Sequence, residues 1–467
     1  MSTEKLTTPI GDFEFTLGGY PTQESAQKLF DALDFQRACQ AYLDFMPAMS
    51  MYSLLEGQEK GWGCKDCSDL AVAADLLTAT PLVLTGNTES VYFACNVDLK
   101  KDGPTVVEIP PQVLGMANDA YFRYIVDFGM AGPDQGRGGK YLLLPPDYDG
   151  DVPEGYFVAH YSRTSRVWVM ARASQTISGM GEQALQWYGD HCAVYPLKDD
   201  YRRPNVMNCG SVFADTTHPN DLQYFVNLDQ VIQYEPTAAF APEQLGLLRS
   251  LGIEKGKTFD PDERMKQILD TAAKTGLGIA RAIAYQAREP EARVYPDRHW
   301  EYIFVGGSHE FLRNGVRNLD ARTLFHFTAI CVTPAMVNKV VGVGSQYMSA
   351  YRDADGDYLN GGKNYQLHLP PNIPVNNFWS VTLYDPGTRS LLQTDQPKPS
   401  VNSFDQPEQN RDGSYDIYFG PSAPAGKERN WVQTVPGKGW FTYIRLYGPL
   451  EPFFDQTWRP DDIVKMA

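Results

Sequence analysis

The sequence predicts an α+β protein that is mostly β, with a helix-containing N-terminal β domain, a helical connector and a C-terminal antiparallel β-sandwich of jelly-roll type. Short apolar runs separated by Gly, Pro and Asp clusters fill residues 82–172 and return from residue 347 onward. Between these stretches, residues 242–290 carry the apolar spacing of helices. We therefore expect a helical segment at 1–60, a β-rich domain at 61–235, a helical connector at 236–335 and a β-sandwich domain at 336–467.

The first predicted helix lies in the N-terminal segment, where apolar residues recur three and four positions apart. Thr22 offers a side-chain oxygen that can cap its start. Pro47 is expected to end or kink the helix, because a proline inside a helix removes a hydrogen bond and clashes with the preceding turn. The apolar stripe consists of Ala26, Leu29, Phe30, Leu33, Ala38, Ala41, Tyr42 and Phe45.

Short strands are predicted in the next segment at Thr105–Ile109, Tyr141–Leu144 and Val167–Ala171. Each is a brief apolar run bounded by turn-forming residues, which is typical of a compact β-rich domain.

The helical connector contains a well-marked helix start. Asp260 can cap it, Pro261 suits the first turn, and Glu263 suits the third position. The apolar stripe that follows consists of Met265, Ile268, Leu269 and Ala272.

The C-terminal segment returns to strands, at Phe378–Tyr384, Tyr415–Phe419 and Trp440–Tyr447. These runs are rich in aromatic and β-branched residues and are separated by Asp-Gly and Pro-Gly turns. About eight short strands at this spacing predict a sandwich of jelly-roll type.

The net charge of the chain limits the kinds of molecule that it is expected to bind. Forty-one Lys and Arg against 57 Asp and Glu give a net charge of −16, which disfavours nucleic acid. The sequence contains no run of 18 apolar residues, so we predict no membrane-spanning helix. The N-terminus MSTEKLTTPIGDFEF has no signal-peptide pattern, so we expect a soluble, cytoplasmic protein.

Several longer motifs make this chain resemble a known bacterial and fungal family, which joins domain of unknown function 1254 to domain of unknown function 1214. The resemblance implies a helix-containing N-terminal β domain and a C-terminal β-sandwich, and it implies no reaction. Relatives often have the sequence features of secreted proteins, and this N-terminus does not show them. The motifs are LTGNTESVY at 84–92, GPD at 132–134, GGKYL at 138–142, NFWSVTLYD at 377–385, TRS at 388–390, DGS at 412–414, FGP at 419–421, NW at 430–431 and RLYGP at 445–449.

Metal sites are not predicted. Cys64 and Cys67 have zinc or redox spacing, but no second pair follows at a distance that would complete four ligands. The seven histidines show no metal-binding spacing. We expect no cofactor and no metal, and the two cysteines are either ordinary thiols, a metal pair or a disulfide.

The loop GPDQGRGGK at 132–140 is a candidate anion site, because glycines let backbone N–H groups approach a ligand while Arg137 and Lys140 supply positive charge. The alternative is a tight connector whose glycines only meet the backbone geometry.

Carboxylates recur where the N-terminal strands meet turns, at Glu89, Asp98, Asp127 and Asp134. Two that converge could act as acid and base. The alternative is that each bonds its own backbone. In the C-terminal segment, Trp379, Tyr384, Trp431, Arg445 and Tyr447 lie on strands, where they either line a ligand site or belong to the core.

The leading hypothesis is a small-molecule enzyme, a hydrolase or lyase that uses carboxylate and tyrosine acid–base chemistry on a small or sugar-like ligand. The alternatives are a non-catalytic protein that binds a carbohydrate or an envelope component, and a structural subunit of a homo-oligomer. Motifs of α/β serine hydrolases, dinucleotide dehydrogenases and zincin proteases are absent. The predicted catalytic residues are Glu89, Tyr92 and Asp134, and the predicted ligand-binding residues are Asn87, Arg137, Lys140, Trp379 and Arg445. The segment with Asn87, Glu89 and Tyr92 is expected to meet the 134–140 loop at one cavity.

Overall fold

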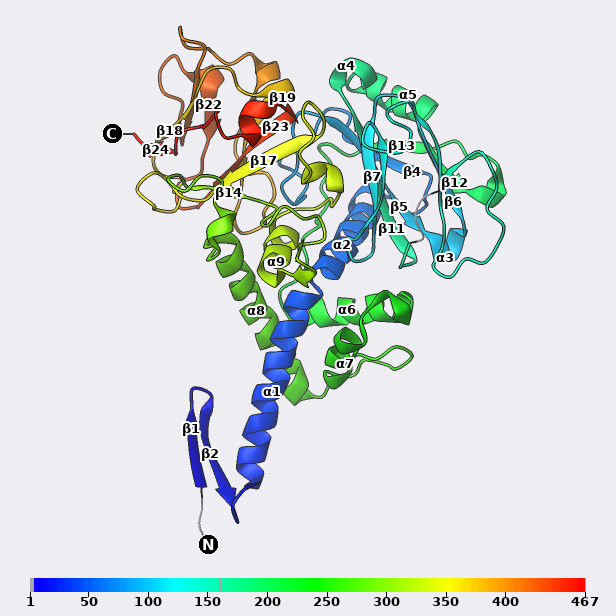
Figure 1. The fold of residues 1–467 in the computed structure, drawn as a ribbon, viewed down its shortest axis with the longest axis vertical. Helices are drawn as coiled ribbons and strands as arrows, with labels where there is room; N and C mark the ends of the chain where they lie inside the picture. Colours follow the sequence, from blue (N-terminus) through cyan, green and yellow to red (C-terminus); the bar gives the residue numbers. More distant parts are fainter. Residues whose placement is uncertain (1–3, 159–161, 467) are drawn as a thin grey trace.

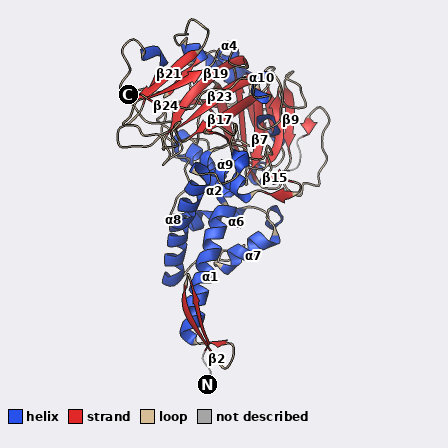
Figure 2. Ribbon diagram, turned by 60° about the vertical axis from the view of Figure 1, so that its left-hand side comes forward, coloured by secondary structure: helices blue, strands red, loops and turns tan. Residues whose placement is uncertain are grey.

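The computed structural model describes residues 4–158 and 162–466 and shows an α+β fold made mostly of sheets. Two β-rich units lie side by side, and a group of helices extends below them to a narrow N-terminal tip (Figure 1). Figure 2 shows the same division, with most strands gathered at one end, and with helices and the short N-terminal strands forming the stem. Helices α7 (Pro242–Ser250) and α8 (Glu263–Tyr285) lie between the units in sequence and below them in space (Figure 1).

The N-terminal unit pairs a six-stranded sheet, ordered β13-β4-β5-β11-β7-β8, with a four-stranded sheet, ordered β10-β9-β6-β12. Apolar residues of both sheets form one core, in which Val169 of the first meets Tyr141 of the second. The strands are β4 (Asp69–Val72), β5 (Val91–Asp98), β6 (Thr105–Ile109), β7 (Leu114–Asp119), β8 (Tyr124–Gly129), β9 (Gly139–Leu143), β10 (Phe157–Val158), β11 (Arg166–Ala173), β12 (Ala193–Pro196) and β13 (Asn205–Asn208), with helices α3 (Leu99–Asp102), α4 (Gln175–Ser178) and α5 (Glu182–His191).

The C-terminal unit pairs a five-stranded sheet, ordered β14-β17-β23-β19-β20, with a four-stranded sheet, ordered β22-β21-β18-β24. Its pairings are antiparallel except for β21 with β22, which is parallel. The jelly-roll connectivity stays a prediction. The elements are β14 (Trp300–Tyr302), β17 (Ser345–Ala350), β18 (Tyr365–Leu369), β19 (Val375–Tyr384), β20 (Ser400–Asn402), β21 (Tyr415–Gly420), β22 (Trp431–Gln433), β23 (Phe441–Pro449), α10 (Glu451–Phe454) and β24 (Val464–Lys465).

The helices share one apolar core with both β units. This core includes Tyr42 of α1, Trp168 of β11 and Tyr443 of β23, so the two β units and the helices pack as one body. The helices are α1 (Gln23–Asp44), α2 (Met46–Gly57), the π-helical turn η1 (Gln58–Trp62), α6 (Leu222–Tyr234), α7 (Pro242–Ser250), α8 (Glu263–Tyr285) and α9 (Leu319–Thr328). Short 3₁₀ turns are η2 (Leu197–Asp199), η3 (Thr237–Ala239), η4 (Pro290–Ala292), η5 (Pro334–Met336), η6 (Ser403–Asp405) and η7 (Glu428–Asn430).

A small three-stranded sheet at the N-terminus and a two-stranded hairpin lie at the edge of this body. The small sheet packs on the first turns of α1, where the backbone N–H of Glu14 donates to Ser25 Oγ over 2.7 Å. The strands are β1 (Glu4–Thr8), β2 (Gly11–Thr16) and β3 (Tyr20–Pro21) in the N-terminal sheet, and β15 (Leu312–Arg313) and β16 (Val316–Arg317) near α9.

The predicted helix signals are confirmed in part. Thr22 caps α1 by accepting a hydrogen bond from the Ser25 N–H. The helix is interrupted between α1 and α2, next to Pro47. The prediction that Asp260 caps the connector helix is wrong. Asp262 caps α8 instead, since its carboxylate accepts from the Met265 N–H over 2.8 Å and leaves Pro261 ahead of the helix.

Candidate functional site

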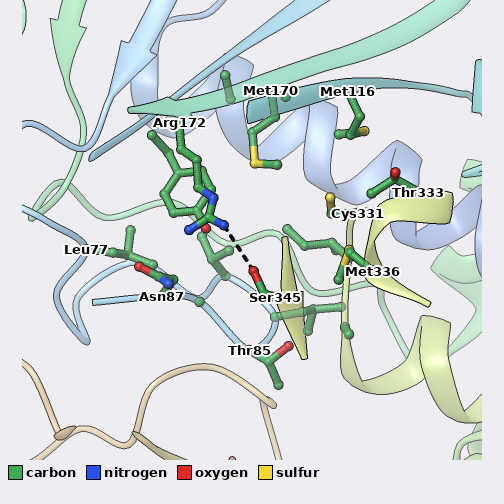
Figure 3. Close-up of a pocket in the computed structure, with 18 of the residues that line it drawn as sticks. Leu77, Thr85, Asn87, Met116, Met170, Arg172, Cys331, Thr333, Met336 and Ser345 are labelled. Atoms are coloured by element: carbon green, nitrogen blue, oxygen red, sulfur yellow. Dashed lines mark hydrogen bonds between the residues drawn. The ribbon is translucent and has the colours of Figure 1, made fainter. Parts of the chain in front are cut away.

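A cavity of about 170 Å³ lies at the boundary between the two β units. We call it the interdomain cavity. Its walls come from β5, β7, β8 and β11 of the N-terminal unit, from β17 and β23 of the C-terminal unit, and from α2 and the segment after α9. Figure 3 shows the apolar side chains Met116 and Met170 on one side of it and Thr85 on another. A largely apolar pocket between domains, with a few polar groups, is the usual form of a small-molecule site.

Strand alternation explains how the N-terminal sheet lines the cavity. In β11, Val167, Val169 and Ala171 enter the core of the N-terminal unit, while the residues between them face the other way. Trp168, Met170 and Arg172 therefore line the cavity. Only the last of them is charged.

The polar end of the cavity is built from cross-strand pairs. Arg172 of β11 lies opposite Tyr92 of β5, and Ser345 of β17 lies opposite Tyr447 of β23. An Arg172 guanidinium N–H donates to Ser345 Oγ over 3.0 Å, which joins the two sheets (Figure 3). One cross-strand pair from each sheet therefore lies at the domain boundary, and the hydrogen bond from Arg172 to Ser345 links the two pairs.

Arg172 has no ion-pair partner in the part of the chain that the structure describes. Its second hydrogen bond goes to Ser90 Oγ over 3.2 Å, and its guanidinium carbon lies 4.9 Å from the centre of the Tyr447 ring. Burial raises the pKa of Tyr92 to about 12 although the charge of Arg172 opposes the rise, so this phenol stays protonated at neutral pH and can donate a hydrogen bond.

Arg445 ties the C-terminal sheet to the N-terminal unit. It donates to Tyr384 Oη over 3.0 Å from Nε and to the Gly86 carbonyl over 3.2 Å, and it also bonds the Thr85 carbonyl. Tyr384 in turn donates to the Gly86 carbonyl over 2.9 Å. The guanidinium both lines the cavity and fixes one of its corners.

Asn87 organises the turn beside the cavity. Its Oδ1 accepts from the N–H groups of Glu89 and Ser90, each over 2.8 Å, and its Nδ2 donates to Tyr447 Oη. Glu89 lies behind the cavity wall with 1% of its surface exposed, and Tyr447 Oη donates to its Oε2 over 3.5 Å. Burial raises the pKa of Glu89, and Arg445 opposes the rise.

Asp127 is a cavity acid that the sequence did not single out from the other turn acids. It lies within β8, is 5% exposed, and accepts from Thr333 Oγ1 over 2.5 Å. Burial raises its pKa to about 7, against the lowering effect of that hydrogen bond. Such a carboxyl exists in both protonation states at neutral pH, as a general acid or base requires.

Cys331 also lines the cavity, where its thiol is influenced by the charges of Asp127 and Arg172, and it has a φ of 74°. Positive φ is uncommon for a residue with a Cβ, and such strain collects at functional sites. Burial raises the pKa of its thiol to about 12, so the group is neutral.

The predicted site residues divide into two groups. Asn87, Tyr92 and Arg445 line the interdomain cavity, whereas Glu89 does not line it and bonds Tyr447, the hydrogen-bond partner of Asn87. The remaining four, Asp134, Arg137, Lys140 and Trp379, do not line it.

The 134–140 loop does not reach the interdomain cavity, so the expected convergence with the segment of Asn87, Glu89 and Tyr92 does not occur there. Asp134 is fully buried, and its carboxylate accepts from the N–H groups of Gly129 and Gly138, each over 2.8 Å. Arg137 is exposed. Lys140 is exposed as well and pairs with Glu108 over 2.5 Å.

Trp379 belongs to the core of the C-terminal unit, since alternation along β19 turns it inward. Its ring centre lies 5.2 Å from that of Tyr415. The alternative reading of this aromatic residue as core therefore holds.

The seven cysteines are free thiols, so Cys64 and Cys67 form no disulfide. Burial raises the pKa of Cys64 to about 12. Within residues 4–158 and 162–466, no three His, Cys, Asp or Glu side chains gather where they could hold a metal ion. His160 lies outside the described residues.

Two families match this chain. One is described as a protein of unknown function, DUF1254, and matches residues 68–196, and the other, DUF1214, matches residues 344–451. No protein with a curated description matches. Across the described residues, none of the helices combines the length and the apolar character needed to cross a membrane.

Two solved structures are similar in fold. A crystal structure of a Vibrio parahaemolyticus protein aligns with a TM-score of 0.56 and 17% identity, over 93% of this chain and 100% of that chain. An uncharacterised Burkholderia cenocepacia protein aligns with a TM-score of 0.42 and 12% identity, over 93% and 95%. The first likeness shows a shared fold.

Proposed function

This chain belongs to the family that joins an N-terminal domain of unknown function 1254 to a C-terminal domain of unknown function 1214, and we propose its function from the interdomain cavity. The protein binds a small organic molecule there and transfers a proton to or from it, as a hydrolase or lyase does. The observation that carries this proposal is Asp127, a cavity carboxyl with a pKa of about 7.

Neighbouring groups suit this chemistry. Arg172 and Arg445 can stabilise negative charge that develops on the bound molecule, and the protonated Tyr92 phenol can donate to it. Glu89 does not line the cavity, and together with Asn87 it bonds the Tyr447 hydroxyl and so holds the ring that lies against Arg172. The acid–base role that the sequence assigned to Glu89 therefore passes to Asp127 in this proposal.

The alternative is a binding protein without catalysis. The apolar walls favour a small apolar body over a carbohydrate, because sugars need polar partners around the ring.

A nuclear magnetic resonance screen separates these functions. The full chain is incubated with small esters, hydroxy acids and unsaturated acids, with saturation transfer to detect binding and signal loss to detect conversion. We expect at least one compound to bind and be converted. Asp127→Asn keeps the shape and removes the titrating group, so binding should stay within about threefold while conversion falls about 10²- to 10⁴-fold.

Asp134→Asn is the matched control, because it changes a buried carboxylate that does not face the cavity. Its conversion rate should equal that of the wild type below its melting temperature. Binding without any conversion would refute catalysis and establish the binding protein. Equal conversion by Asp127→Asn and wild type would refute the role of Asp127.

A further inference from the structure

We infer that the interdomain cavity takes a small organic carboxylate, with its head group at Arg172 and its apolar part toward Met116 and Met170. This inference rests on the proposed function and names the class of its ligand. It depends on three features of the cavity: an excess of donors at one end, the local charge, and the size of the apolar part.

Hydrogen-bond donors outnumber acceptors at the Arg172 end. The guanidinium has five N–H donors, and the protein offers it the hydroxyls of Ser90 and Ser345. Tyr92 and Tyr347 also line this end, and within the described chain neither hydroxyl has a protein hydrogen-bond partner. Such a group of donors is completed by a ligand that carries acceptors.

The charge at this end is positive. Arg172 and Arg445 both line the cavity, whereas Asp127 is the acidic side chain of the lining and lies against Thr333. Glu89 is the other carboxyl near the guanidinium groups. It does not line the cavity, and it accepts a hydrogen bond from Tyr447 Oη. Arg172 is partly buried and has no carboxylate partner among the described residues. Withdrawing a guanidinium from water without such a partner is costly, so an anion from solution should be favoured there. The planar fork of arginine fits a carboxylate with two parallel bonds.

The rest of the cavity requires an apolar body. Met116, Met170, Leu54 and Ile303 line it away from Arg172. A cavity of 150 Å³ in another protein binds benzene, so the space of about 170 Å³ suits one ring or a chain of about six carbons. Benzoate and hexanoate meet both requirements, while acetate supplies only the head group.

Isothermal titration calorimetry of the full chain tests this inference, with benzoate, hexanoate, acetate, and the neutral benzamide and hexanamide as probes. We expect each larger carboxylate to bind at least about 10-fold more tightly than its amide and than acetate. Arg172→Gln should weaken benzoate binding about 10-fold or more and leave benzamide binding within about twofold. Arg137→Gln removes an exposed arginine outside the cavity and should change neither.

Tyr347→Phe is a second variant that tests the inference if Arg172→Gln fails to fold. It removes one donor hydroxyl and keeps the ring. It should weaken benzoate binding at least about threefold and spare benzamide. Equal affinity for benzoate and benzamide would overturn the carboxylate inference and leave the proposed function standing. If neither these probes nor any compound of the screen binds, the proposed function falls as well.

Discussion

Asp127 and Asp134 are two buried carboxylates with opposite surroundings. Asp134 receives two backbone N–H groups and the Tyr141 hydroxyl, which replace the water it loses. Asp127 receives one hydroxyl, from Thr333, and its burial is otherwise uncompensated. The first carboxylate therefore serves the fold, whereas the second is held at a cost to stability, as is common at functional sites.

This contrast predicts opposite stability effects. The folded-state pKa of Asp127 is raised from 3.8 to about 7, so folding loses stability as pH rises from about 4 to about 7. Asp127→Asn should remove this loss and be about 2–4 kcal/mol more stable than wild type at pH 8, with little difference at pH 3.5. Urea unfolding at both pH values measures it.

Asp134→Asn should instead lower the unfolding free energy at pH 8 by about 1–3 kcal/mol, because a backbone N–H loses its acceptor. A pH-independent effect of Asp127→Asn would contradict the raised pKa.

At the residue scale, the sequence predicted part of the site. Asn87, Tyr92 and Arg445 stand in the motifs that carry the family resemblance, and they line the cavity. Arg172 was missed, although the sequence indicates its position. In the strand RVWVMARA, alternation places it on the face opposite the core valines. The strain at Cys331 could not be predicted, because it depends on backbone conformation.

At the scale of elements, strands were predicted better than helix caps. Thr105–Ile109 matches β6 at both ends, because alternation and turn residues are local signals. The α8 cap was misplaced because two aspartates, Asp260 and Asp262, precede the apolar stripe, and residue type alone does not decide which of them caps the helix.

Helix α8 offers a matched pair of glycines. A Cβ on Gly276 would lie 2.4 Å from Cδ1 of Tyr42, which is buried in the shared core, whereas a Cβ on Gly278 would meet nothing within 4 Å. We expect Gly276→Ala to lower the unfolding free energy by about 1–3 kcal/mol through overpacking. Gly278→Ala should raise it by about 0.5–1 kcal/mol through helix propensity. Thermal and urea unfolding of both variants provides the measurement, and two stabilised variants would show that α1 and α8 pack more loosely.

At the scale of the whole molecule, the sequence predicted two β units and helices but not their contact. Asn87 and Tyr447 bond across 360 positions of sequence, and no local pattern specifies such a pair. The cavity was unpredictable for the same reason. The homo-oligomer stays a prediction that analytical ultracentrifugation can measure.

Arg445 should couple the unfolding of the two β units. Arg445→Met removes the donors to the carbonyls of Thr85 and Gly86, so we expect a loss of about 2–4 kcal/mol and a separation of the transitions seen by fluorescence and by circular dichroism. Arg411→Met changes an exposed arginine and should stay within about 0.5 kcal/mol of wild type, with coincident transitions. Coincident transitions in Arg445→Met would show that the shared apolar core alone couples the units.

The cavity walls come from both β units, so the small molecule proposed above would bind the folded chain and not the unfolded one. By mass action, a ligand at 100 times its dissociation constant adds about 2.7 kcal/mol to the free energy of unfolding. That gain is comparable to the contribution expected from Arg445. Since proteolysis in a cell acts on the unfolded fraction, the lifetime of this protein would then rise and fall with the supply of its own small molecule.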